Sequence, residues 1–252
     1  MRNPENNAFS DLELVGLYDT INSGTEDHAF YWGQAPEHMA RILDVGCGTG
    51  VLAIGFWENG HEVVGIDPQG AMIAYCREKL EDDRLTWEVC DLPNYRATSD
   101  FDLVTMTGHA FQCLLTDEEI LTFFECVRDL LGEKGALLFE SRNPDLKPWE
   151  KWDGYSDELE TGEGEKFVVT TEVMSFEEEV LEFKETFLLG EGQRRKVSRS
   201  RLRFAAKDAI LDLAGQAGLQ LEQMWGDWEG NAFDPKESRE MIFRLGRLSK
   251  NL

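Results

Sequence analysis

The chain has 252 residues, of which 42% are hydrophobic and 29% are charged, a composition typical of one soluble α/β domain with or without a small insertion. Its net charge of −24 argues against a nucleic-acid partner, because phosphate binding requires a positive surface. No run approaches the roughly 18 apolar residues of a membrane span, so no membrane partner is expected.

The N-terminal residues 1–7 lack the apolar core of a signal peptide, and a cytoplasmic location is therefore expected. The five cysteines are dispersed and include no Cys-x-x-Cys pair. This pattern predicts reduced thiols rather than a disulfide framework or a zinc site, and no metal centre is expected.

Residues 10–40 precede the first strand and are predicted to form one or two helices that either cover the cofactor or cap the sheet. Short apolar runs then alternate with helical patterns, which are expected near 50–59, 69–80 and 117–131. The predicted strands are Ile42–Val45, Glu62–Ile66, Leu85–Cys90, Asp102–Thr107 and Gly135–Ser141. Alternating strands and helices predict a doubly wound, mostly parallel sheet of the Rossmann-like α/β class, with ligands at the carboxyl ends of the strands.

The pattern changes after Pro144. Residues 147–164 are polar and are predicted to be a loop, whereas 166–175, 179–189 and 194–204 alternate with period two and predict a three-stranded antiparallel insertion. A helix at 206–217 and strands Leu219–Trp225 and Arg239–Gly246 would complete a seven-stranded sheet. The predicted units are a helical cap plus cofactor-binding core (1–146), an acceptor-side insertion (147–204) and the completion of the core (205–252).

The glycine-rich turn Asp44-Val-Gly-Cys-Gly-Thr-Gly50 follows the first strand. A dinucleotide fingerprint requires Gly-x-Gly-x-x-Gly, but position 51 is Val. Asp44 would also repel a pyrophosphate. It favours a ligand with positive charge, such as S-adenosylmethionine, which carries a sulfonium and an ammonium group and no phosphate.

Beyond this loop the sequence resembles the class I S-adenosylmethionine-dependent methyltransferases. The resemblance extends over residues 42–143, through Gly65-Ile-Asp67, Cys90-Asp91-Leu92, Phe101-Asp102-Leu103-Val104 and Leu131-Gly-Glu-Lys-Gly-Ala136. The subgroup that it is most similar to acts on small molecules and has a β insertion after the fifth strand. The resemblance implies S-adenosylmethionine as cofactor and S-adenosylhomocysteine as product.

The match assigns cofactor roles to individual residues. Asp67 would accept hydrogen bonds from the ribose hydroxyls, Asp91 would meet the adenine amino group, and Tyr18 would reach the methionine end. The full predicted cofactor set is Tyr18, Asp44, Gly46, Cys47, Gly48, Asp67, Pro68, Met72, Asp91, Leu92 and Thr107. The alternatives are that Asp44 and Asp67 are caps or surface charges, that Asp91 forms a turn, and that Tyr18 only packs.

His109 follows the fourth strand and is the predicted catalytic residue, either as a general base or as an acceptor hydrogen-bond partner. The alternative is a histidine that shapes the loop. Glu140 and Arg142, at the end of strand five, are weaker site candidates or a salt-linked strand end. Four tryptophans flank the insertion and the last loop: Trp149, Trp152, Trp225 and Trp228. They would either wall an acceptor pocket and hold a cation, or form the core that joins the insertion to the sheet, which is expected for at least two of them.

Residues 194–203 hold six basic side chains and no acid. They indicate either a site for an anionic acceptor or cross-strand pairs with Glu177, Glu178, Glu179, Glu182 and Glu185. The second interpretation is favoured, because a charge run in a strand usually pairs with its neighbour.

The predicted function is methylation of a small-molecule acceptor by in-line transfer from S-adenosylmethionine. The alternatives are an NAD-linked Rossmann oxidoreductase and a non-catalytic module that binds S-adenosylmethionine. The acceptor, its methylated atom and the oligomeric state are not predicted.

Overall fold

A computed structural model describes residues 10–24, 26–190 and 194–248. Its central sheet has seven strands in the order β10-β11-β5-β4-β1-β2-β3, and β11 runs antiparallel to both of its neighbours. The strands are β1 (Arg41–Val45), β2 (Glu62–Asp67), β3 (Leu85–Val89), β4 (Phe101–Met106), β5 (Leu131–Arg142), β10 (Leu219–Trp225) and β11 (Glu240–Arg247). The predicted doubly wound, mostly parallel sheet is confirmed, although β5 begins four residues before the expected Gly135.

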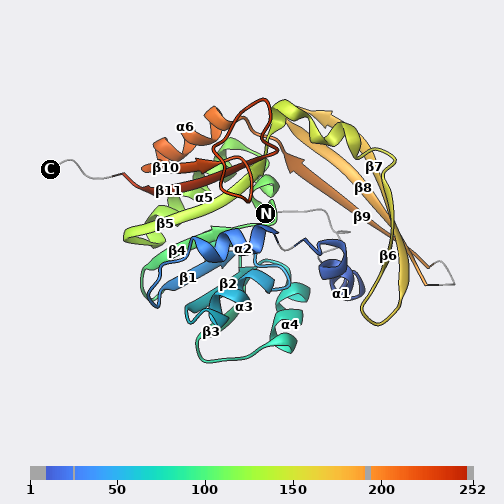
Figure 1. Cartoon of the computed structure of the whole chain (residues 1–252), viewed down its shortest axis with the longest axis horizontal. Coiled ribbons are helices and arrows are strands. Elements are labelled where there is room, and N and C mark those ends of the chain that lie inside the picture. Colours follow the sequence, from blue (N-terminus) through green and yellow to red (C-terminus); the bar gives the residue numbers. More distant parts are fainter. Residues whose placement is uncertain (1–9, 25, 191–193, 249–252) are drawn as a thin grey trace.

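Helices cover both faces of this sheet (Figure 1). On one face α5 (Asp117–Leu130) and α6 (Lys207–Ala217) bury Phe124 and Ile210 in a core that includes Leu43 and Val45. On the other face α2 (Glu26–Gly33), α3 (Val51–Glu58) and α4 (Gly70–Lys79) pack in a core that includes Ile42 of the same strand. Alternate residues of β1 therefore enter opposite cores, as expected for a strand buried on both sides. No helix within the described residues has both the length and the apolar character needed to cross a membrane.

The insertion after β5 is an antiparallel sheet with the order β6-β7-β8-β9. It comprises β6 (Ser156–Glu160), β7 (Lys166–Glu177), β8 (Val180–Leu189) and β9 (Arg194–Arg203). The predictions of a loop over 147–164 and of three strands were wrong, because β6 lies in that segment and pairs with β7. Four of the five β6 side chains are exposed, so this edge strand carries no hydrophobic alternation that sequence reasoning could detect.

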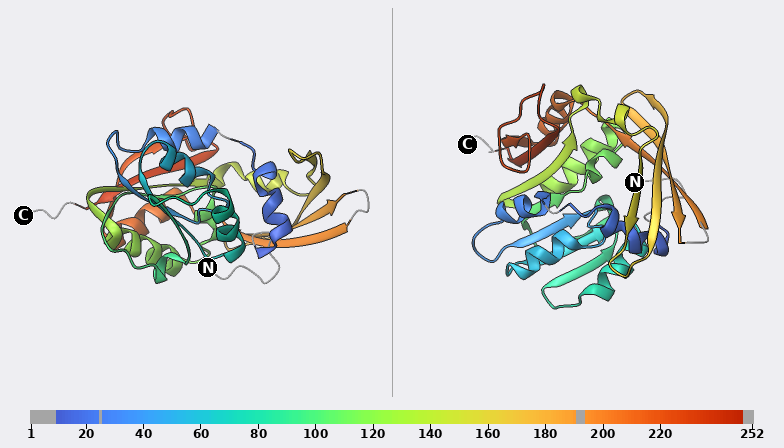
Figure 2. Two further views of the ribbon diagram at one scale, coloured as in Figure 1. Left: turned by 90° about the horizontal axis from the view of Figure 1, so that it is seen from below. Right: turned by 45° about the vertical axis from the view of Figure 1, so that its right-hand side comes forward.

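Helix α1 (Leu12–Ile21) lies between the central sheet and the insertion (Figure 1, Figure 2). Its Leu14 and Leu17 are buried in a cluster with Phe167, Phe187 and other side chains of β7 and β8. On its other side Asp19 accepts hydrogen bonds from the Thr49 hydroxyl at 2.5 Å and from Lys79 Nζ at 2.6 Å. The helix thus connects the insertion to the glycine loop of the core.

Packing of α2 on α3 depends on Gly55, because a Cβ there would lie 2.2 Å from the Trp32 ring. Gly16 on α1 is exposed, and a Cβ there would meet nothing within 4 Å. We expect Gly55→Ala to lower the free energy of unfolding by about 1–3 kcal/mol through overpacking. Gly16→Ala should change it by no more than about 1 kcal/mol, in the stabilising direction. Urea unfolding followed by tryptophan fluorescence tests this, and equal effects of the two substitutions would contradict it.

Candidate active site

A cavity of about 610 Å³ lies between the carboxyl edge of the central sheet, α1 and the insertion. Eight of the residues predicted from the sequence line it, and they come from α1, the glycine loop and the segments that follow β2 and β4. They are Tyr18, Gly46, Gly48, Asp67, Pro68, Met72, Thr107 and His109. The fold therefore brings together residues that span more than ninety positions of the sequence.

Four predicted cofactor residues are not part of the cavity wall. Asp44, Cys47 and Leu92 are buried. Asp91 lies at the end of β3, where its carboxylate accepts a hydrogen bond from the Asn94 side chain at 2.6 Å. This contact is what the turn-forming alternative for Asp91 leads one to expect, and its cofactor role stays a prediction.

The glycine loop has a backbone conformation that residues other than glycine rarely adopt. Gly46, Gly48 and Gly50 have φ angles of +70°, +54° and +81°. The N–H groups of Gly46 and Cys47 donate to the Ile66 carbonyl oxygen at 2.8 and 3.1 Å. The loop is therefore tied to the end of β2, and its backbone faces the cavity at Gly46 and Gly48.

Asp67 holds the same loop from the end of β2. One carboxylate oxygen accepts the Gly48 N–H at 3.2 Å and the other accepts the Gln69 N–H at 2.7 Å. Burial raises the pKa of Asp67, and these two hydrogen bonds oppose the rise. Each oxygen keeps a second lone pair that a ligand hydroxyl can use.

Asp44 is buried with one carboxylate oxygen unpaired. Its Oδ1 accepts the Thr105 hydroxyl at 2.9 Å, whereas Oδ2 has no hydrogen-bond partner among the described residues. Burial raises the pKa of Asp44 to about 7. A nearby positive charge would favour the ionised form and compensate the buried oxygen.

Tyr18 is held above the loop by the contacts of its neighbour Asp19 with Thr49 and Lys79. A Cβ on Gly48 would lie 4.0 Å from the Tyr18 ring, so the ring is close to the loop backbone. Burial, followed by the charges of Asp67 and other acids, raises the pKa of Tyr18 to about 12. The phenol therefore stays protonated and can donate a hydrogen bond.

His109 adopts a left-handed φ of 59° and lines the cavity. Its Nε2 lies 2.8 Å from Glu240 Oε2, and its backbone N–H donates to Glu140 Oε1 at 2.5 Å. The second oxygen of the buried Glu140 accepts the Tyr31 hydroxyl. The Glu240 partner was missed, because β11 follows the insertion and lies 131 residues away in sequence.

The insertion supplies one wall of the cavity, which includes Phe183, Glu185 and Phe187 of β8. These residues were also missed, although period two places all three on one face of the strand. Trp152 lines the cavity with its ring 5.1 Å from the Arg142 guanidinium. The other three flanking tryptophans pack, Trp149 on Phe176 of the insertion and Trp225 and Trp228 around Phe30 of α2. These contacts lie within the insertion or within the central unit, so the expectation that at least two of the tryptophans join the insertion to the sheet stays a prediction.

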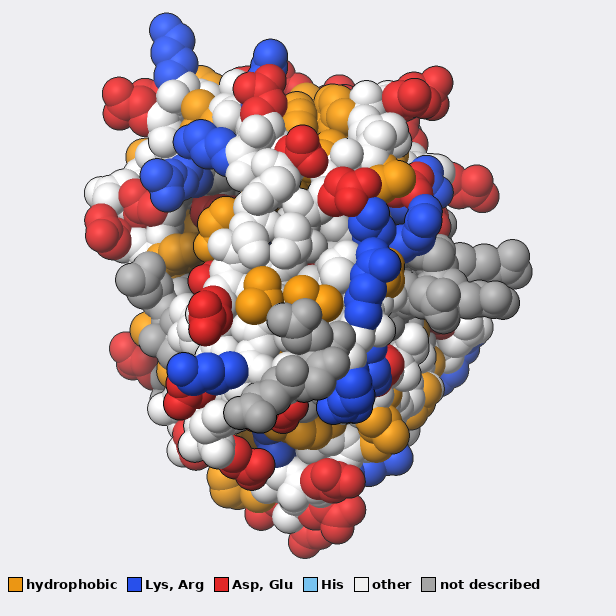
Figure 3. Space-filling model, turned by 90° about the vertical axis from the view of Figure 1, so that its right-hand side faces the viewer, with side chains coloured by type: hydrophobic (Ala, Val, Ile, Leu, Met, Phe, Trp, Pro, Cys, Tyr) orange, Lys and Arg blue, Asp and Glu red, His pale blue; other side chains and the backbone are white. Residues whose placement is uncertain are grey.

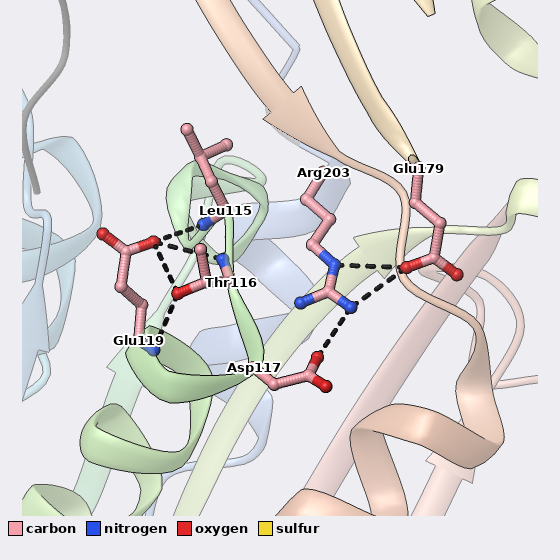
Figure 4. A network of polar contacts seen from close by, with 6 residues as sticks. All are labelled: Leu115, Thr116, Asp117, Glu119, Glu179 and Arg203. Carbon is pink, nitrogen blue, oxygen red and sulfur yellow. Dashed lines mark hydrogen bonds and ion pairs between the residues drawn. The ribbon is translucent and has the colours of Figure 1, made fainter. Parts of the chain in front are cut away.

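The basic residues of β9 pair with acidic side chains, but only some of these are the glutamates of residues 177–185 that were expected. Arg203 contacts Glu179 at 3.0 Å and also Asp117 of α5 at 2.7 Å, which ties the insertion to the core (Figure 4). Arg199 lies 3.8 Å from Glu182, whereas Arg194 and Lys196 pair with acids of α1. Positive and negative side chains are accordingly mixed on this side of the molecule (Figure 3). The expected pairing of Glu185 was wrong, because its side chain lies on the cavity face of β8.

Comparisons with known proteins agree with this geometry. Residues 42–135 match the family described as Methyltransferase domain. The matched segment makes up less than half of the chain and covers the glycine loop and strands β1 to β4. The chain is 37% identical over 125 residues to a putative methyltransferase of Geobacillus sp. (strain WCH70), an overlap of 49% of this chain and 50% of that protein. The chain thus matches only about half the length of the first curated relatives.

Structural likeness extends over the whole chain. The methyltransferase CcbJ from Streptomyces caelestis has a TM-score of 0.80 at 20% identity, covering 98% of this chain and 100% of that chain. The sugar N-methyltransferase KedS8 from Streptoalloteichus sp. has a TM-score of 0.73 at 18% identity, covering 92% and 93%. The fold, including the insertion, is therefore shared with these enzymes.

The residues present fit S-adenosylmethionine, the cofactor predicted from the sequence. The unpaired Asp44 oxygen suits a ligand with a sulfonium and an ammonium group, and it would oppose a pyrophosphate. The left-handed glycines let the ligand approach the loop backbone.

Asp44→Asn tests the buried carboxyl. The folded protein keeps the Asp44 proton up to about pH 7, whereas the unfolded chain loses it near pH 4, so wild-type stability falls as pH rises through this window. Between about pH 4 and about pH 8, we expect the free energy of unfolding of the wild type to fall by roughly 4 kcal/mol relative to that of Asp44→Asn. Urea unfolding at both pH values measures this. The control is Asp129→Asn at a side chain that is 67% exposed, which should show no such trend. A pH-independent difference for Asp44→Asn would contradict the assignment.

Proposed function

We propose that this protein is an S-adenosylmethionine-dependent methyltransferase that acts on a small-molecule acceptor. The observation that carries the proposal is a single cavity that joins the glycine loop and Asp67 to a wall supplied by the insertion. The cofactor's reacting end and its acceptor would then share one enclosed space.

In this proposal Gly46 and Gly48 contact the methionine portion, and Asp67 binds the ribose hydroxyls. The buried Asp44 does not line the cavity and would act through its charge on the sulfonium and ammonium groups. Pro68 and Met72 border the adenosine, with Leu92 and Asp91 beyond them, and Thr107 is the cofactor-binding residue that follows β4. Cys47 supports the loop from the core, since its side chain is buried. Tyr18 contributes a protonated phenol near the methionine end.

When bound, the cofactor supplies an electrophilic methyl carbon whose bond to sulfur breaks with both electrons left on sulfur. The protein's contribution is to align the nucleophile with that carbon, and positioning can supply roughly 7–11 kcal/mol of the barrier. An acceptor that must lose a proton needs a base. We propose His109 for that role, with Glu240 accepting the Nε2–H and leaving Nδ1 unprotonated.

A small acceptor is supported by the position of the insertion. Phe183, Phe187 and Trp152 form a wall that faces the glycine loop across a cavity of about 610 Å³, a volume typical of small-molecule sites. KedS8, which shares the fold and the insertion, is described as a sugar N-methyltransferase.

Asp67→Asn tests the cofactor assignment. Loss of the carboxylate should weaken S-adenosylhomocysteine binding roughly 10- to 100-fold, because hydrogen bonds to charged groups contribute about 1.5–3 kcal/mol. The control is Glu62→Gln at the other end of β2, where the side chain is 51% exposed. Calorimetry provides the affinities. No binding by the wild type at millimolar ligand would overturn the proposed function, and a thermal shift with NADH alone would favour the oxidoreductase.

His109→Asn tests the base, because asparagine tolerates the left-handed backbone at this position. Turnover should fall roughly 10²- to 10⁴-fold with S-adenosylhomocysteine affinity unchanged. The measurement uses labelled S-adenosylmethionine and an acceptor found by screening small molecules, with the exposed His38→Asn as control. If His109→Asn turns over as fast as the wild type between about pH 6 and pH 9, His109 is not part of the mechanism. A screen without products despite tight cofactor binding would favour the non-catalytic module.

A further inference from the structure

Glu185 is an acidic side chain on the apolar, cavity-facing side of the insertion. It lies on β8 between Phe183 and Phe187, and all three line the cavity. Its direct neighbours across the two ladders are Thr171 of β7 and Ser198 of β9. An uncharged residue would continue the apolar face here, so the carboxylate requires an explanation.

No hydrogen bond or ion pair reaches the Glu185 carboxylate from the residues that the structure describes. The acids and bases on the opposite face of the same sheet do pair, as Lys184 with Glu172 at 2.6 Å and Arg199 with Glu182 at 3.8 Å illustrate. Burial alone raises the pKa of Glu185, with no compensating partner. The side chain is half-buried and lines the cavity, so a positively charged ligand group there would supply the partner that the carboxylate lacks.

The position of Glu185 relates it to the proposed methyl-transfer site. The charges of both Asp67 and Glu185 raise the pKa of Tyr18, so the Tyr18 phenol lies within electrostatic reach of both carboxylates. Asp67 belongs to the loop side of the cavity and Glu185 to the insertion side. A ligand group held at Glu185 would therefore lie across the cavity from the glycine loop.

The charge and the aromatic rings around Glu185 select among acceptor classes. A neutral acceptor would leave the carboxylate uncompensated, and an anionic one would be repelled by Glu185 and Asp67. A cationic amine would be attracted by the carboxylate and by the faces of Phe183, Phe187 and Tyr18.

The basic side chains that line the cavity do not neutralise the Glu185 carboxylate. The Arg142 guanidinium donates to Gln112 Oε1 at 2.9 Å and lies over the Trp152 ring. The charges of Glu240 and Glu140 act on it as well. Arg201 and Lys151 are exposed at the cavity margin.

We propose that Glu185 is an acceptor-binding residue that holds a positively charged amino group, and that the methyl acceptor is a small primary or secondary amine. The bound ammonium group would lose one proton to the base proposed above, His109, and the freed nitrogen lone pair would form the bond to the methyl carbon as the bond from that carbon to sulfur breaks. This inference rests on the proposed methyltransferase function. It assigns the amine to the insertion and the cofactor to the glycine loop.

The test compares amines with alcohols of the same shape. The probes are cyclohexylamine with cyclohexanol and 2-phenylethylamine with 2-phenylethanol, titrated by calorimetry into the full chain saturated with S-adenosylhomocysteine. In the wild type at least one amine should bind roughly tenfold or more tightly than its alcohol. Glu185→Gln keeps the shape of the side chain and should reduce that amine's affinity to the level of the alcohol, whose own affinity should not change. Glu182→Gln, on the opposite face of β8, should alter neither affinity.

The outcomes separate the two proposals. If S-adenosylhomocysteine binds but no amine exceeds its alcohol, or if the preference survives Glu185→Gln, the Glu185 assignment is overturned and the methyltransferase proposal stands. If S-adenosylhomocysteine does not bind the wild type, both fall. Retained S-adenosylhomocysteine affinity in Glu185→Gln shows that this variant is folded, so a lost amine preference supports the inference.

Discussion

The double attachment of α1 is the constraint on which the site depends. One side of the helix buries Leu14 and Leu17 against β7 and β8, and the other side reaches the glycine loop through Asp19. Burial of two leucines contributes roughly 3–6 kcal/mol, and the polar contacts with Thr49 and Lys79 set the direction in which the helix faces. The same helix carries Tyr18, which lines the cavity together with residues of the insertion wall and the glycine loop.

Carboxylates placed where water is scarce determine what the cavity can bind. Asp44 has an unpaired buried oxygen, Asp67 divides its oxygens between two loop N–H groups, and Glu185 has no partner among the described residues. Burial raises the pKa of each carboxyl because the ionised form loses hydration. A cavity bordered in this way is a poor site for phosphate and a favourable one for positively charged ligands.

Sequence reasoning was reliable for structure that depends only on residues close together in the chain. The apolar runs located the central strands, Thr116 and Glu119 form a capping box whose Thr-x-x-Glu spacing is visible in the sequence (Figure 4), and Gly218 ends α6 in a left-handed conformation. The order Asp44, Asp67, Asp91 along three strand ends indicated the cofactor class. Sequence reasoning failed for β6, because most of its side chains are exposed and give no apolar alternation. It also failed for Glu185, because the expectation of charge pairing was preferred to the alternation, which places Glu185 on the apolar face of β8.

The sequence by itself therefore determined the sheet, the loop and the kind of cofactor, because strand periodicity and glycine conformation depend on neighbours within a few residues. Only the tertiary structure decided the acceptor side. His109 meets Glu240, Tyr31 meets Glu140, and Arg203 joins Asp117, all across more than 80 residues of chain. The first two pairs are set by the strand order of the central sheet and by the packing of α2 on it, and the third by the position of the insertion beside α5. No local sequence pattern carries that information, because the sequence around a charged residue can be the same whether its side chain faces solvent, an opposite charge or a cavity.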